Sequence, residues 1–157
     1  MATASPHDTL QDEIKTIICL IDLMKQEQQF LVAANSDGLA TLTPLKNQLV
    51  EHMTLLGQQR HANLERAGCA ASEPGMTSWL LGIKDTAIAA SWQTLLGHTR
   101  EAKELNRVNG MLINKQLTQN QTLINAMRTP AGAADTGFYG PSGQATPVSS
   151  KRRLVIG

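Results

Sequence analysis

The side chains that most often bind metals or transfer protons are scattered along this chain. None of the four histidines stands three residues after a glutamate, which is the spacing of a helical di-iron site. We expect them on helix surfaces or at the edge of an apolar seam. The pattern predicts no metal site and no cofactor. The histidines are His7, His52, His61 and His98.

Nucleophilic chemistry finds no support either. Cys19 lies in an apolar helical stretch and Cys69 in a Gly/Ala segment, so the cysteines form no redox or metal spacing and are expected to be reduced thiols. No serine has the flanking residues of a nucleophile elbow, and no glycine-rich segment follows a strand as a phosphate-binding loop does. Glu101 and Glu104 stand one helical turn apart among basic residues, which is typical of a solvated helix face. We predict that the protein is not an enzyme.

Charge and hydropathy exclude two further classes. The 157 residues carry 14 Lys and Arg against 13 Asp and Glu. The basic run from Lys151 to Arg153 is too short to neutralise many phosphates, so no nucleic-acid partner is expected. The longest apolar run, 17–24, is short and contains Asp22, so neither secretion nor membrane insertion is expected. We predict a cytoplasmic protein.

A first helix is predicted over about 6–34. Ser5 suits the cap and Pro6 the first helical position, while the turn-forming residues 35–38 end the helix. Apolar residues recur between these limits at alternating spacings of four and three, interrupted by Gln28, which predicts a heptad seam. The seam residues are Leu10, Ile14, Ile17, Ile21, Met24 and Leu31.

A second helix is predicted over about 43–67. Thr43 and Pro44 suit its cap and first position, and Gly68 suits its end. Its apolar positions are Leu45, Leu49, Met53, Leu56 and Leu64.

A third helix is predicted over about 77–128, because no proline follows until Pro130. Gly82, Gly97 and Gly110 are its weakest points. Its first half is rich in apolar residues, whereas asparagines interrupt the later half. A buried amide must be hydrogen-bonded, so these asparagines either fix the helix register or meet the backbone of a partner. The sequence leaves both readings open.

Beyond this helix, prolines and glycines preclude a regular element, so residues 130–157 are expected to form a flexible tail. Phe138 and Tyr139 are unusual there, because the chain contains only two Phe and one Tyr. They either fold back onto the helices or anchor on a partner.

Together these elements predict an all-α fold. Helices over 6–34, 43–67 and 77–128 would form an elongated antiparallel hairpin or bundle of three long helices over residues 1–129, followed by the flexible C-terminal tail. A homodimer that completes the bundle is left open.

The later part of the chain resembles the FlgN family of flagellar type III export chaperones. The resemblance is most specific in LNRVNGMLINKQL, which begins at Leu105, in Asn120, and in FYGPSGQAT, which begins at Phe138. The first two helices match mainly by their heptad pattern. A longer Ala/Gly stretch, 130–135, departs from the family pattern.

The resemblance implies a cytosolic, non-catalytic chaperone that binds the C-terminal helical segments of the hook-filament junction proteins FlgK and FlgL. It implies delivery of this cargo to the export gate, and Phe138, Tyr139 and Gly140 are the residues expected to dock on the gate protein FlhA. A self-associating coiled-coil adaptor without cargo is the alternative. The residues expected to bind cargo are Leu105, Asn106, Val108, Asn109, Leu112, Ile113, Asn120 and Leu123.

Overall fold

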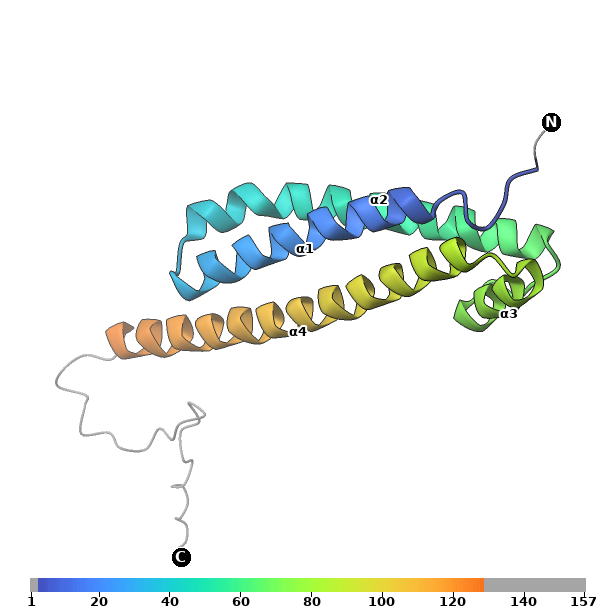
Figure 1. Cartoon of the computed structure of the whole chain (residues 1–157). Helices are drawn as coiled ribbons and strands as arrows, with labels where there is room; N and C mark the ends of the chain where they lie inside the picture. Colours follow the sequence, from blue (N-terminus) through green and yellow to red (C-terminus); the bar gives the residue numbers. More distant parts are fainter. Residues whose placement is uncertain (1–2, 129–157) are drawn as a thin grey trace, which may run out of the picture. The chain divides into compact units, whose positions relative to one another are not determined.

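A computed structural model describes residues 3–128, and these residues form an all-α fold, as the sequence predicted. The four helices are α1 (Leu10–Val32), α2 (Ser36–Arg66), α3 (Glu73–Ile83) and α4 (Thr86–Arg128). Three are long and α3 is short (Figure 1). Within the described range, residues up to Gln116 belong to one compact unit, and Leu117 to Arg128, the last turns of α4, belong to a second.

The first helix begins later than the expected position at Pro6. Residues 6–9 form a turn, in which the Asp8 carboxylate accepts a hydrogen bond from the Ser5 amide at 2.7 Å. Ser5 is therefore not the helix cap, and α1 begins at Leu10. The seam was predicted correctly, because five of its six positions are buried and Ile14 packs against the core.

The second helix begins at Ser36, well before the expected start at 43. Asn35 provides a cap, because its side chain accepts a hydrogen bond from the Gly38 amide at 2.9 Å. Pro44 lies inside α2, where it removes one backbone donor without ending the helix. Leu45, expected in the seam, is 47% exposed, so that assignment was wrong.

The third expected helix is divided into α3 and α4. Lys84 adopts the left-handed conformation with φ of 55°, which ends α3. Asp85 then starts α4, because its carboxylate accepts hydrogen bonds from the amides of Ala87 and Ile88 at 2.9 and 3.1 Å. The break therefore results from these two residues and not from Gly97, through which α4 continues.

Three long segments of the first unit share one core. Figure 1 shows α1 and α2 side by side, and pairs such as Arg60 with Glu13 and Lys46 with Glu27 show that they run antiparallel. Residues 86–116 of α4 run in the same direction as α1, because Lys25 pairs with Glu101 and Asn109 binds near Glu27. The buried core residues are Leu10, Ile17, Leu20, Ile21, Met24, Leu64, Met76, Trp92, Leu95 and Ala102.

Two glycines provide a matched test of the packing of α3. A Cβ atom added to Gly75 would collide with the backbone carbonyl of Ala70, whereas one added to Gly97 would meet no atom within 4 Å. We expect Gly75→Ala to lower the free energy of unfolding by about 3 kcal/mol or more, because backbone atoms cannot move aside cheaply. Gly97→Ala should raise it by about 0.5 to 1 kcal/mol, since alanine favours the helix. Urea denaturation followed by circular dichroism measures both changes, and equal stability of the two variants would contradict this packing.

Candidate functional site

Docking of α4 onto the first two helices begins at a buried ion pair. Glu13 is 1% exposed, and it receives hydrogen bonds from Nε and Nη2 of Arg60 at 3.0 and 3.2 Å. Thr9 donates a further hydrogen bond to the same carboxylate at 2.7 Å. The Arg60 guanidinium lies 4.8 Å from the centre of the buried Trp92 ring, which is a cation–π contact. One residue from each of α1, α2 and α4 thus meets in a single contact.

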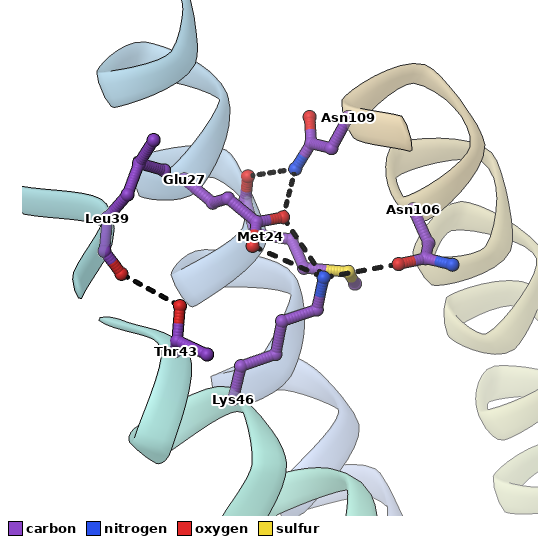
Figure 2. Close-up of polar contacts among 7 residues, drawn as sticks. All are labelled: Met24, Glu27, Leu39, Thr43, Lys46, Asn106 and Asn109. Atoms are coloured by element: carbon purple, nitrogen blue, oxygen red, sulfur yellow. Dashed lines mark hydrogen bonds and ion pairs between the residues drawn. The ribbon is translucent and has the colours of Figure 1, made fainter. Parts of the chain in front are cut away.

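A second polar cluster joins the same three helices farther along α4 (Figure 2). Lys46 of α2 lies 3.0 Å from the Glu27 carboxylate of α1, and it donates a hydrogen bond to the Asn106 amide oxygen at 3.2 Å. Asn109 of α4 donates to the Glu27 carboxylate at 2.7 Å and to the Met24 carbonyl at 2.9 Å. We call Glu27, Lys46, Asn106 and Asn109 the polar cluster.

Of the two asparagines that α4 contributes to this cluster, Asn109 is the buried one, with only 1% of its surface exposed. Both atoms that face its amide nitrogen are acceptors, so the amide orientation is determined by its partners. Its Oδ1 is buried and has no hydrogen-bond partner in the described structure. This geometry favours the register reading of Asn109, because sliding α4 by one residue would separate the amide from both acceptors.

Gln116 adds a third polar contact, a hydrogen bond from its side chain to the Leu31 carbonyl of α1. The sequence drew attention to the amide side chains of α4, Gln116 among them, but not to Glu27 and Lys46. Glu27 and Lys46 carry no local signal, because a charged residue beside a heptad seam is usually solvated. Only the pairing of distant helices shows that Glu27 is buried.

The eight residues expected to bind cargo fall into three groups. Asn109 is buried against α1, as described above. Four of them are exposed, including Asn106, although its amide oxygen accepts the hydrogen bond from Lys46. The half-buried residues are Leu105, Val108 and Leu112, and the other exposed ones are Ile113, Asn120 and Leu123. The structure does not bring the eight onto one open face, and their role in binding stays a prediction.

The end of α4 carries an apolar stripe that sequence reasoning found only in part. The exposed fraction of its apolar residues ranges from 43% at Ile124 to 76% at Met127. Leu117, Ile124 and Met127 were missed, although they continue the spacing of three and four residues along the helix. We call this face the terminal stripe, and its residues are Leu117, Asn120, Leu123, Ile124 and Met127.

Electrostatics around the terminal stripe are weak. The sequence has no charged residue from Gln116 to Met127. Earlier on α4, hydrogen bonds from Arg107 hold the pKa of the exposed Glu104 below its usual value, and the same pair raises the pKa of Arg107. An uncharged apolar helix face suits contact with another apolar helix better than contact with a charged small molecule.

A groove lies between α1 and α2. Cys19, Asp22 and His52 line it together with leucine and glutamine side chains. In the range 3–128, no three His, Cys, Asp or Glu side chains are grouped so as to hold a metal ion. The same range contains no helix that is both long and apolar enough to cross a membrane.

The residues expected to dock on an export gate, Phe138, Tyr139 and Gly140, lie outside the described residues. The predicted boundary between helices and tail, at 129 and 130, falls at the edge of the described range.

Comparison with known proteins gives one consistent family. The sequence model of the family described as FlgN protein matches residues 1–147. The chain is 24% identical over 153 residues to the flagella synthesis protein FlgN of Proteus mirabilis, covering 96% of this chain and 97% of that protein. It is 27% identical over 145 residues to the flagella synthesis protein FlgN of Salmonella typhimurium, covering 91% and 86% respectively. No solved structure matches the chain.

The amide of Asn109 offers a test of the polar cluster. We expect Asn109→Ala to lower the free energy of unfolding by about 1 to 3 kcal/mol, because it removes two buried hydrogen bonds and leaves the Met24 carbonyl without this donor. The matched control is Asn106→Ala, which removes one exposed hydrogen bond and should cost about 0.5 kcal/mol or less. Equal losses in urea denaturation would show that the cluster does not depend on Asn109.

Proposed function

The chain belongs to the FlgN family, and on that premise we propose that it is an export chaperone of the bacterial flagellum. FlgN proteins are non-enzymatic chaperones, so the function to be explained is protein binding. The proposed cargo is the pair of hook-associated proteins FlgK and FlgL. The protein would bind their C-terminal helical segments in the cytoplasm and deliver them to the export gate.

The observation that carries this proposal is the terminal stripe of α4. Four of its five residues are large and apolar, and all four are at least 43% exposed in the described structure. A single exposed leucine needs no explanation, but apolar residues repeated along one helix face form a surface suited to a partner helix. An amphipathic helix of the cargo fits such a face, because its own apolar residues recur at the same spacing.

Binding would combine two kinds of contact. The apolar residues of the stripe would supply most of the affinity, at about 25 cal/mol per Å² of buried apolar surface before ordering costs are deducted. Asn120 would accept or donate hydrogen bonds at the centre of the stripe, and Asn106 would do so beside the polar cluster. The half-buried Leu105, Val108 and Leu112 would extend the contact through the parts of their side chains that stay exposed.

Delivery is assigned to the segment after α4. We propose that Tyr139, with Phe138 and Gly140, anchors the loaded chaperone on FlhA. An aromatic side chain in a segment rich in small and polar residues can bind a pocket and be released again. Separate surfaces for cargo and gate would let the chaperone hold its cargo until the gate is reached.

The alternative is an adaptor that associates only with itself and carries no cargo. The exposed amides of α4, such as Asn120, are compatible with it. Co-purification separates the two functions, because only a chaperone forms a discrete complex with FlgK or FlgL.

The cargo proposal predicts that charge on the terminal stripe weakens binding. The double variant Leu123→Glu with Ile124→Glu should weaken the FlgK or FlgL complex by about a hundredfold, because each buried leucine or isoleucine contributes about 1.5 to 3 kcal/mol. Leu81→Glu on α3, at a site that is 72% exposed, is the matched control and should bind normally. Co-purification with light scattering measures both complexes. If neither the unmodified chain nor the control binds cargo while circular dichroism shows both folded, the chaperone proposal fails.

The gate proposal predicts a separation of binding from export. Tyr139→Ala should retain the FlgK complex but reduce secretion of FlgK by about tenfold or more, as loss of an aromatic anchor usually does. The secreted and cytoplasmic amounts of FlgK in cells that carry the variant provide the measurement. Normal secretion by the variant would remove Tyr139 from the mechanism.

A further inference from the structure

We propose that residues 5–9, the segment before α1, are a latch that holds α3 closed over one end of the core. The helix α3 is then a lid, which opens while α1, α2 and residues 86–116 of α4 stay packed. All the residues involved belong to the compact unit that ends at Gln116. The inference goes beyond the cargo function and does not depend on it, because it concerns no residue of the terminal stripe.

The helix α3 depends on contacts with the rest of the unit. It has 11 residues, and an isolated helix shorter than about 12 to 15 residues is marginal in water. The connection 67–72 separates it from α2, and the left-handed Lys84 separates it from α4. Of the four helices it has the fewest buried residues, which are Gly75 and Met76. Elements with so little burial open first in a folded protein.

His7 holds α3 at a point beyond these buried residues. Its ring stacks on the ring of Trp79, with the two ring centres 5.8 Å apart and the two planes inclined by 18°. Trp79 lies about one turn after Gly75 and is half-buried. Stacked aromatic rings attract each other beyond the apolar area that they bury. The second half of α3 is therefore held by a side chain from outside the helix.

The latch itself is anchored on α2 and not on α3. Asn63 of α2 is 6% exposed, and its side chain donates a hydrogen bond to the Ser5 carbonyl at 3.0 Å. The Asn63 amide oxygen accepts a hydrogen bond from Arg66 at 3.1 Å, which fixes the amide orientation. The Ser5 hydroxyl lies 2.7 Å from Nδ1 of His7, so the same residue positions the ring. Opening of α3 thus breaks the stack while the latch stays in place.

The closed lid hides apolar surface. Met76 of α3 and Leu64 of α2 are both 0% exposed and belong to the same core cluster. Separation of α3 from α2 exposes both side chains to water, which opposes the opening. The stack of His7 on Trp79 adds to this resistance, so it determines how often this end of the core becomes accessible.

Amide hydrogen exchange of the full chain, followed residue by residue by NMR, tests the latch. His7→Ala should accelerate exchange in α3 by about threefold or more, because the stack is lost, and should leave α1 unchanged. His7→Phe keeps an aromatic ring and should retain slow exchange. The matched control is His52→Ala, at an exposed position of α2, which should exchange as the unmodified chain does. Unchanged exchange in α3 of His7→Ala, or equal acceleration in α1, overturns the proposal.

The same data separate an opening lid from a fraying helix end. In a lid, the amides of Met76 and Thr77 accelerate together with those of the residues after Trp79, because the whole helix leaves α2. Acceleration confined to residues 80–83 would show that only the last turn unwinds, and the lid would be rejected.

A double-mutant cycle tests whether His7 acts through Trp79. Trp79→Leu keeps an apolar side chain at the edge of the core but removes the ring that His7 stacks on. Adding His7→Ala to Trp79→Leu should then accelerate exchange in α3 by less than about 1.5-fold, because the two residues no longer interact. A further acceleration as large as that of His7→Ala alone would mean that His7 supports another part of the fold, and the latch would be rejected.

Discussion

The buried contact of Glu13, Arg60 and Trp92 is the interaction on which the arrangement of the long helices depends. A carboxylate that is 1% exposed is tolerated only because a guanidinium neutralises it with two hydrogen bonds. Removal of one member of such a pair typically costs about 3 to 5 kcal/mol, since the other charge stays buried. The Trp92 ring of α4 packs over the Arg60 guanidinium. The ion pair between α1 and α2 therefore also positions α4.

Along α4, from Trp92 toward the polar cluster, the buried side chains change from apolar to polar. Trp92, Leu95 and Ala102 are the buried apolar residues of α4, and the next buried residue is Asn109. The amide contacts of Asn109 and Gln116 then replace apolar packing against α1. Hydrogen bonds of this kind require one alignment but add little net stability, so they determine register more than strength.

The sequence allowed the helical class and the seam of α1 to be predicted, because a heptad pattern is a local property. The break at Lys84 was missed because a left-handed lysine has no sequence signature comparable to glycine. The start of α2 was missed because Thr43 and Pro44 have the pattern of a cap and a first helical position, whereas the helix is capped upstream by Asn35. Asn109 was singled out, but its partner Glu27 was not, because they stand 82 positions apart and only the fold brings them together.

The order of contacts along the chain has a consequence for folding. The helices α1 and α2 are joined by a connection of three residues, 33–35, so their seam can form early and locally. The hydrogen bonds between α1 and α4 span as many as 85 positions, so their formation must close a long loop. During synthesis, we expect the α1–α2 hairpin to collapse first and α4 to dock last, after its own residues have left the ribosome.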